Sequence, residues 1–320
     1  MSDDSQVQTY GFILIDGFAL MSYASASEPL RAANLLAGRD LYRLSAFSPD
    51  GSMARASSGA LVPAAPLPAK ADGLHTVFVC AGGGPAGWNA PGVLGTLRLL
   101  ARQGVRIGGI SGGAYLLAEA GLLDERRFTI HWEHAPALAE AFPTLMPERA
   151  RFVVDGNRIT CGGGIAPLDM MHALIRERMG DAFARRVSDW YLHTQVGEPA
   201  APQRASLAER HGVHHPALLA VLEKMESSIE TPLSRGALAR MAGVSMRHLD
   251  RLFAERMESS FLGEYRRIRL DHARKLLSQS ALSIAEVAIA CGYSSPGHFA
   301  SVFRERYGLS PKAWRDQSTD

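Results

Sequence analysis

The sequence has few cysteines and no long apolar run, and each shortage excludes a class of protein. Its 320 residues include three cysteines, Cys80, Cys161 and Cys291, which lie far apart and form no C-x-x-C pair. A disulfide framework or a structural zinc site is therefore not expected, and the cysteines are typical of buried thiols in a reducing compartment. No apolar run approaches the roughly 18 residues that a membrane span requires. We expect no metal, no cofactor and no association with a membrane.

The sequence also has little net charge. The formal net charge is +2, made up of +3 from Val213 onward and −1 before it. A bias this small does not identify a nucleic-acid-binding protein. The first residues, MSDDSQVQTYGF, are acidic and polar, which is not typical of a secretory signal. The cytoplasm is the expected location.

Up to about residue 195, short apolar runs alternate with helical patterns. The expected strands are residues 10–15, 42–47, 76–80, 105–110, 152–154 and 158–161, and the helices between them include 24–36, 93–103 and 169–179. This alternation predicts an α/β domain with a doubly wound, mostly parallel sheet, which binds ligands at the carboxyl ends of its strands. Three strands end in glycine clusters, at residues 82–84, 112–113 and 162–164. Glycine there allows a ligand to approach the backbone closely.

The composition changes after this region. Residues 197–212 are rich in proline, alanine and polar residues, and they are predicted to form a linker. From residue 213 onward the patterns are helical throughout. The expected organisation is an α/β domain over 1–196, a linker over 197–212 and an all-α domain over 213–320.

The all-α part contains an internal repeat. The pattern AxxxGVS at residues 239–245 aligns with AxxxGYS at residues 288–294, and the helices that follow align at an offset of 50 residues. A helix, a short turn with glycine and a second helix form a helix-turn-helix unit. A helix expected over residues 263–277 joins the two units. Its length of roughly 22 Å suits two recognition helices that read successive turns of DNA from one face.

This part of the chain resembles the DNA-binding domain of the AraC/XylS family over residues 219–315. The resemblance rests on LARMAGVSMRHLDRLF, IRLDHARKLL and SIAEVAIACGYSSPGHFASVFRERYGLSPKAWR. It implies binding to double-stranded promoter DNA by the first turns of the two recognition helices. The residues expected to face bases are Met246, Arg247, Asp250 and Arg251 in the first helix, and Ser295, Pro296, Gly297, His298 and Ser301 in the second.

The arginines of this domain fall into two expected groups. Arg247 and Arg251 are candidates for bidentate contacts to guanine. The arginines expected either to reach phosphates or to be solvated surface charges are Arg266, Arg269, Arg304 and Arg306. The second recognition helix begins with short side chains, which favours readout of phosphates and DNA shape over direct readout of bases.

The pattern GISGG at residues 109–113 fits the G-x-S-x-G elbow that carries the nucleophile of many hydrolases. Ser111 is open to three interpretations: a nucleophile, a residue of a binding pocket, or buried structure. A serine hydroxyl is a weak nucleophile unless a base and an orienting acid are assembled beside it. His131 is the candidate base, with Glu133 or Asp155 as its acid. Neither acid precedes His131 in the chain, as the usual order of this motif requires.

The N-terminal part resembles the class I glutamine amidotransferase/PfpI superfamily. The resemblance rests on GFILIDGFALMSYASASEPLRAAN, GGISGGAYLLAEAGLLDERRFTIHWEHAP and ITCGGGIAPLDMMHALI, and it implies a flavodoxin-like fold. Enzymes of that superfamily have a cysteine at the elbow, an acid shortly after the first strand and often a histidine. Here the elbow carries Ser111, the aligned acid position falls near Leu20, with only Asp16 close by, and only His131 stands where a histidine is expected. Together with the AraC-type tail, the architecture resembles the GlxA subgroup of transcriptional regulators.

We favour the hypothesis of a former active site that now serves as a sensor pocket. Backbone N–H groups of the glycine clusters suit a carboxylate, and aromatic and acidic side chains suit a cation. A small zwitterion, such as an amino acid or a quaternary amine, is the expected effector. The expected effector-binding residues are Phe18, Gly82, Gly83, Ser111, Gly112, His131, Trp132 and Glu133.

The sequence thus predicts a ligand-responsive transcription factor that is not an enzyme. We expect it to activate transcription, to form a homodimer and to contact RNA polymerase. Two alternatives remain open. One is a serine hydrolase or amidase that uses Ser111 and carries a DNA-binding tail, and the other is a ligand-independent DNA-binding protein whose α/β domain only oligomerises.

Overall fold

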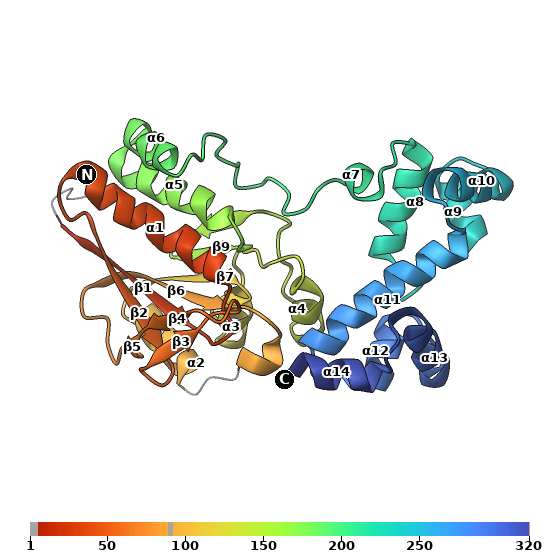
Figure 1. Ribbon diagram of the computed structural model, residues 1–320, viewed down its shortest axis with the longest axis horizontal. Helices are drawn as coiled ribbons and strands as arrows, with labels where there is room; N and C mark the ends of the chain where they lie inside the picture. The colour runs from red at the N-terminus through yellow and green to blue at the C-terminus, as the bar shows by residue number, and fades with distance from the viewer. Residues whose placement is uncertain (1–5, 89–91, 320) are drawn as a thin grey trace. The chain divides into compact units, whose positions relative to one another are not determined.

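The computed structural model describes residues 6–88 and 92–319, and the chain divides into two compact units, Met1–Gln203 and Arg204–Asp320 (Figure 1). The division falls inside the segment expected to be a linker. That segment is not without structure, because helix α7 (Leu207–His211) lies in it. Ser206 and Glu209 form a capping box that fixes the start of this helix.

The first unit is built on a seven-stranded sheet in the order β5-β2-β1-β6-β7-β9-β8. Its strands are β1 (Gln8–Leu14), β2 (Tyr42–Ser48), β5 (Ala65–Pro66), β6 (Leu74–Ala81), β7 (Arg106–Ser111), β8 (Phe152–Asp155) and β9 (Arg158–Cys161). All neighbours pair in parallel except β8, which is antiparallel to β9. A small hairpin, β3 (Met53–Arg55) and β4 (Leu61–Pro63), accompanies the sheet. The predicted mostly parallel sheet is confirmed.

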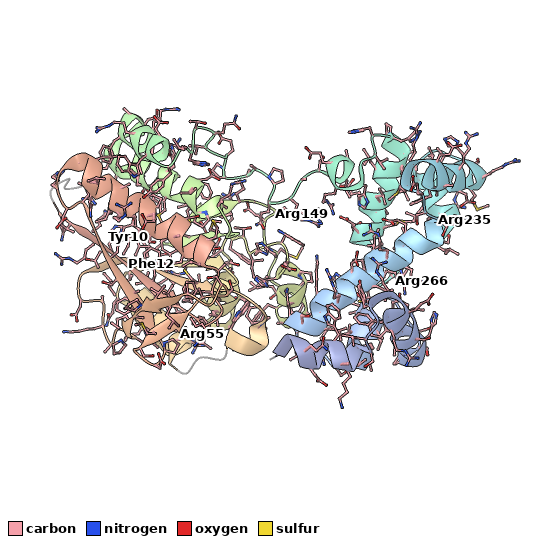
Figure 2. All side chains as sticks on the ribbon, in the orientation of Figure 1. Tyr10, Phe12, Arg55, Arg149, Arg235 and Arg266 are labelled. Carbon is pink, nitrogen blue, oxygen red and sulfur yellow. The ribbon has the colours of Figure 1, made fainter. Side chains whose placement is uncertain are left out.

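Helices cover both faces of this sheet (Figure 1). One layer contains α1 (Leu20–Ala37), α5 (Ala166–Met179) and α6 (Asp181–Trp190), and the other contains α2 (Val93–Arg102) and α3 (Gly113–Glu119); η1 (Pro85–Trp88) and α4 (Ala135–Ala141) complete the unit. The alternation along β1 explains why both layers form. Phe12 packs in the core with α1, whereas Ile13 packs in the core with α2. Figure 2 labels Tyr10 and Phe12, whose rings both stack on Phe78 in the first of these cores.

The second unit consists of helices. They are α7, α8 (Pro216–Ser227), α9 (Arg235–Met241), α10 (Met246–Met257), α11 (Phe261–Gln279), α12 (Ile284–Ala290), α13 (Pro296–Tyr307) and α14 (Pro311–Thr319). A serine side chain caps the start of every helix from α9 to α13: Ser234, Ser245, Ser260, Ser283 and Ser295. Each cap contributes about 1 kcal/mol by satisfying a helix N–H group that has no partner within its own helix.

Helix α11 belongs to two hydrophobic cores. Phe261 and Tyr265 pack with α9 and α10, whereas Leu276 and Leu277 pack with α12 and α13. The helix has 19 residues, so it is about 28 Å long. Because both ends are packed, this helix fixes the spacing between the two helix-turn-helix units.

Candidate functional site

Ser111 ends β7 in a sharp elbow, and α3 begins two residues later. Its φ angle is +58°, in the left-handed region that an L-residue adopts at a cost of about 1–2 kcal/mol. The neighbouring glycines make the elbow possible. A Cβ atom on Gly113 would lie 2.0 Å from the carbonyl oxygen of Val79, and one on Gly109 would lie 2.6 Å from the backbone nitrogen of Ala114. The structure therefore has the strand–elbow–helix geometry that the GISGG pattern predicted.

The three glycine clusters end neighbouring strands, β6, β7 and β9, and so meet at one edge of the sheet. A Cβ atom on Gly163 would lie 2.8 Å from the Cβ atom of Ser111, which shows how closely the third cluster approaches the elbow. The next residue, Gly164, donates its N–H to the Ser22 hydroxyl over 2.8 Å. Ser22 is buried, and its part in this site was not predicted, since the pattern ALMSYAS gives no sign of which serine turns inward.

Aromatic and histidine rings gather beside the elbow. The Trp88 indole N–H donates to the Gly82 carbonyl over 2.6 Å, and its ring lies edge-on to His134 at 5.1 Å between centroids. His131 is 5.5 Å from His134 and 5.4 Å from Trp132, also between ring centroids. Its backbone N–H points to the Ser111 carbonyl over 3.4 Å. The sequence had indicated His131 and Trp132 but not Trp88.

The protonation of His131 bears on whether Ser111 is activated. The Nδ1 atom of His131 accepts the backbone N–H of Glu133 over 3.3 Å, so the neutral ring carries its proton on Nε2. In this tautomer Nε2 is a donor and does not accept a proton from a serine hydroxyl. Among the residues that the structure describes, no hydrogen bond joins the Ser111 hydroxyl to the His131 ring. Asp155 lies opposite Arg158 in the register of β8 and β9, at the end of β9 away from the elbow. It is therefore not an orienting acid for His131.

Two of the expected effector contacts are not available in this structure. Phe18 is fully buried against Tyr23, so its ring has no face open to a ligand. The N–H of Gly112 is already donated to the Ala81 carbonyl over 2.9 Å. The nearby N–H groups of Gly83 and Gly113 have no acceptor among the described residues.

The thiols near this site are not reactive groups. Burial raises the pKa of both Cys80 and Cys161, the latter to about 12, and both therefore stay protonated near neutral pH. Within the described ranges no cluster of histidine, cysteine or acidic side chains is arranged to hold a metal ion. In the same ranges no helix is both long and apolar enough to cross a bilayer.

The first helix-turn-helix unit consists of α9 and α10, joined by a turn at Gly243 with a φ angle of +68°. Met246, Arg247 and Arg251 are exposed on α10, as predicted for residues that face DNA. Their surroundings differ. Arg247 has no partner among the described residues, whereas Arg251 contacts His248 and Glu255 on its own helix.

Asp250, the remaining predicted residue of α10, is held by the neighbouring helix. Its carboxylate accepts from Arg235 of α9 over 2.9 Å, and both side chains are nearly half exposed. Figure 2 labels Arg235 at this position. The pair joins the two helices of the unit, so Asp250 has a role within the protein besides any contact with a base.

The second unit consists of α12 and α13, joined by a turn at Gly292 with a φ angle of +71°. The residues exposed at the start of α13 and along it include Ser295, Pro296, Gly297, His298, Ser301 and Arg304. All of them were predicted to meet DNA. Arg304 has no partner among the described side chains, as a residue that reaches phosphate requires.

Two other arginines were expected at phosphates or in solvent, but they bind the protein itself. Arg269 donates to the carbonyl oxygens of Cys291 and Gly292, both over 2.7 Å. Arg306 contacts Asp271 of α11 over 3.3 Å. The expectation was wrong for Arg269, which is half-buried against the turn of the second unit. Arg266, labelled in Figure 2, is exposed on α11.

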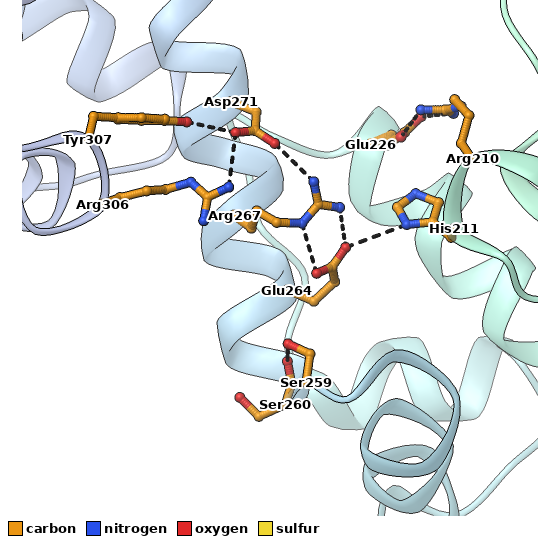
Figure 3. Close-up of polar contacts among 10 residues, drawn as sticks. All are labelled: Arg210, His211, Glu226, Ser259, Ser260, Glu264, Arg267, Asp271, Arg306 and Tyr307. Atoms are coloured by element: carbon orange, nitrogen blue, oxygen red, sulfur yellow. Dashed lines mark hydrogen bonds and ion pairs between the residues drawn. The ribbon is translucent and has the colours of Figure 1, made fainter.

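A row of polar residues on α11 holds α13 in place (Figure 3). Arg267 binds Glu264 through two nitrogen atoms and Asp271 over 3.0 Å. Asp271 in turn accepts from the Tyr307 hydroxyl over 2.6 Å and from Arg306. The negative charges of the partly buried carboxylates are therefore balanced by arginine. Charge-assisted hydrogen bonds attach α13, the second recognition helix, to α11.

Comparisons with known proteins agree with both halves of this architecture. Residues 12–177 match the DJ-1/PfpI family, and residues 238–317 match a helix-turn-helix domain. The chain is 62% identical over 318 residues to the HTH-type transcriptional regulator GlxA of Rhizobium meliloti (strain 1021), covering 99% of this chain and 98% of that protein. It is 40% identical over 306 residues to the HTH-type transcriptional regulator CdhR of Pseudomonas aeruginosa, covering 95% of this chain and 90% of that protein.

Among solved structures, an AraC family transcriptional regulator from Pseudomonas putida matches with a TM-score of 0.52 and 28% identity. That match covers 57% of this chain and 99% of the other. The similarity to the regulators above extends over nearly the whole chain, so it includes the α/β domain as well as the two DNA-reading units. The chain belongs to the AraC family of DNA-binding transcriptional regulators, in the group whose N-terminal domain is of the DJ-1/PfpI type.

Proposed function

We propose that the α/β domain binds a small nitrogen-containing metabolite at the Ser111 elbow without transforming it, and that this binding controls transcription. The observation that carries the proposal is an elbow without a base. Ser111 has the strained conformation of a nucleophile, but His131 uses Nδ1 to accept a backbone N–H, and among the described residues its ring makes no hydrogen bond to the serine hydroxyl. Removing the partners of a nucleophilic serine lowers turnover by several orders of magnitude.

The groups around the elbow suit a zwitterion. The N–H groups of Gly83 and Gly113 and the Ser111 hydroxyl are donors for a carboxylate. The rings of His131 and Trp132 stand beside them, and Glu133 supplies a negative charge. An aromatic face and a carboxylate together attract an ammonium or quaternary amine. The effector class is therefore an amino acid or a betaine-like amine.

The similar proteins support transcriptional regulation as the result of effector binding. Those named above are transcriptional regulators, and none of their names describes an enzyme. We propose that this chain activates its target promoters in the bacterial cytoplasm, that it works as a homodimer through the α/β domain, and that it contacts RNA polymerase. On the DNA, the exposed residues of α10 and α13 read the operator, with Arg247 as the main base-reading side chain.

A thermal-shift screen of the full chain against amino acids and trimethylated amines tests the sensor. A specific ligand at a hundredfold excess over its Kd raises the free energy of unfolding by about 2.7 kcal/mol. Ser111→Ala should weaken that binding about ten- to hundredfold, because one hydroxyl–carboxylate hydrogen bond is lost. Ser58→Ala, at an exposed serine, is the matched control. If no member of the panel stabilises the protein, the proposed effector class is wrong.

The elbow geometry is also that of a serine hydrolase, so hydrolysis is the alternative function to test. A fluorophosphonate probe distinguishes the two functions, because it labels an activated serine covalently. We expect no adduct on Ser111 by mass spectrometry of the intact protein. A near-stoichiometric adduct that is lost in Ser111→Ala would show that the domain is an enzyme.

A further inference from the structure

The last residue of the first unit, Gln203, has its side chain inserted among loops of the α/β domain. Its Nε2 atom lies 3.0 Å from the Thr129 hydroxyl, 2.9 Å from the Ile130 carbonyl and 2.6 Å from the Ala150 carbonyl. Its Oε1 atom accepts the backbone N–H of Trp132 over 2.8 Å. Both ends of the amide are therefore bound, and a surface residue beside a domain boundary seldom has so many partners.

These contacts involve the loops that form the effector site. Trp132 follows His131, whose backbone meets the Ser111 carbonyl. On the other side of the amide, a Cβ atom on Gly162 would lie 2.7 Å from the Cδ atom of Gln203, so the amide packs directly on the third glycine cluster. Gly163 then packs on Ser111. The two segments beside the elbow, residues 131–133 and 162–164, thus each lie within one or two residues of a contact with Gln203.

The chain that leads to Gln203 is anchored a second time. The buried carboxylate of Asp169 accepts from Arg151, from His193 over 2.7 Å and from the backbone N–H of Gly197 over 2.7 Å. This anchor lies away from the elbow and fixes the segment at residue 197. Gln203 is then the last point at which the α/β domain holds the chain before Arg204, where the second unit begins.

We propose that Gln203 is a positioning residue that couples the effector site to the DNA-binding unit. A ligand at the elbow shifts the backbone of residues 131–133 and 162–164, and this changes how firmly the Gln203 amide is held. The hold on Gln203 determines how freely the following segment, 204–206, leaves the α/β domain. The position of the effector rests on the proposed function, whereas the hold on Gln203 does not depend on it.

Limited trypsin digestion of the full chain measures this hold directly, because Arg204 is itself a trypsin site. In Gln203→Ala, cleavage after Arg204 should be about tenfold faster than in the wild type, since proteolysis follows the population of the open form and the variant loses the amide hydrogen bonds. Gln203→Met, which keeps the length of the side chain, should give a similar acceleration. Gln195→Ala removes an exposed glutamine from the same segment and should cleave at the wild-type rate. Equal rates in all four proteins would overturn the proposal.

Hydrogen exchange of the wild type provides a measurement that does not depend on the folding of a variant. The Trp132 N–H, which donates to Gln203, should exchange at least tenfold more slowly than a free amide. Exchange at the rate of an unprotected amide would show that the hydrogen bond from Trp132 to Gln203 does not hold the Gln203 side chain in place.

The coupling is tested with any amine or amino acid that stabilises the protein in the thermal-shift panel. Such a compound should change the rate of cleavage after Arg204 in the wild type and leave it unchanged in Gln203→Met. Stabilisation without a change in cleavage would overturn the coupling and leave the sensor intact. If no compound stabilises the protein, the proposed function and the coupling both fail, and the trypsin and exchange results still decide whether Gln203 is held.

Discussion

The guanidinium carbon of Arg269 lies 4.0 Å from the centroid of the Tyr293 ring, while its nitrogen atoms bind the carbonyl oxygens at the end of α12. Arg269, a single side chain of α11, thus fixes the turn of the second helix-turn-helix unit by stacking and by hydrogen bonds. The turn is also tightly packed from the other side. A Cβ atom on Gly292 would lie 2.6 Å from the Ile229 carbonyl.

Arg269→Lys should therefore impair the second unit although it keeps the charge. A lysine does not reproduce two planar N–H donors together with a stacking face. We expect a loss of about 1–3 kcal/mol of stability in this unit. In a footprinting experiment the half-site bound by α13 should lose protection before the one bound by α10. Arg266→Lys, at an exposed arginine of the same helix, is the control. Equal loss of protection at both half-sites in Arg269→Lys would show that Arg269 supports the whole domain and not the second unit alone.

Arg247→Ala should reduce affinity for the cognate operator by about 1–3 kcal/mol and change affinity for random DNA little. The reason is its place in the first turn of α10, exposed and without a partner among the residues that the structure describes. Competition binding assays with single-base operator variants measure this effect. A similar loss on both kinds of DNA would mean that Arg247 contacts phosphate.

Arg304→Ala is expected to behave in the opposite way. It lies in the last turn of α13, so its loss should weaken binding to all sequences alike and lower the slope of log K against log salt by about one. Titrations at several salt concentrations measure the slope. A change in base preference at a single operator position would be inconsistent with a phosphate contact.

Gly112→Ala should destabilise the α/β domain through Trp88. A Cβ atom on Gly112 would lie 2.3 Å from the indole ring, which must then move and give up its hydrogen bond to Gly82. Overpacking of this kind costs about 1–3 kcal/mol. We expect a lower Tm and a red shift of tryptophan emission. In Gly87→Ala the added methyl group meets no atom of the described residues within 4 Å, so this variant should melt like the wild type.

The stability of the DNA-binding domain should fall as the pH decreases below 6.5. Burial, assisted by Lys275, lowers the pKa of His272 from 6.5 to about 4. Between these values the unfolded chain binds a proton that the folded domain does not, so acid favours unfolding by up to about 1.4 kcal/mol per pH unit. Hydrogen exchange of the α11 amides at pH 7 and pH 5 measures the change. His272→Gln should reduce the dependence, with exposed His214→Gln as the matched control; an unchanged dependence in His272→Gln would assign it to other groups.

Local patterns were sufficient to predict most of the fold. The apolar run at residues 10–15 and the AxxxG turns of the two helix-turn-helix units act between neighbours in sequence, so they can be recognised there. The start of α1 was placed at residue 24 although the helix begins at Leu20. Its N-cap is Ala19, which makes no capping hydrogen bond, so the usual start signal is missing.

The site was less accessible to this reasoning, because its decisive contacts join distant parts of the chain. Phe18 looked available for a ligand because nothing local buries it, but Tyr23 and the core cover it. Trp88 and Gln203 were missed for the same reason. Their partners lie at Gly112 and at Trp132, and no periodicity or spacing connects those positions.

The two recognition helices differ in sequence and stand in fixed order on a single rigid helix. One begins with Met246 and Arg247 and the other with Pro296 and Gly297. A subunit that reads DNA with two unlike surfaces imposes a direction on the duplex, because the same two half-sites in reverse order place each helix on the wrong bases. With both helices on the DNA as proposed, the operator of one subunit is expected not to be a palindrome and to point toward or away from the gene it controls. Inverting it in place, without changing a single base pair within it, creates a promoter on which the bound regulator faces the other way.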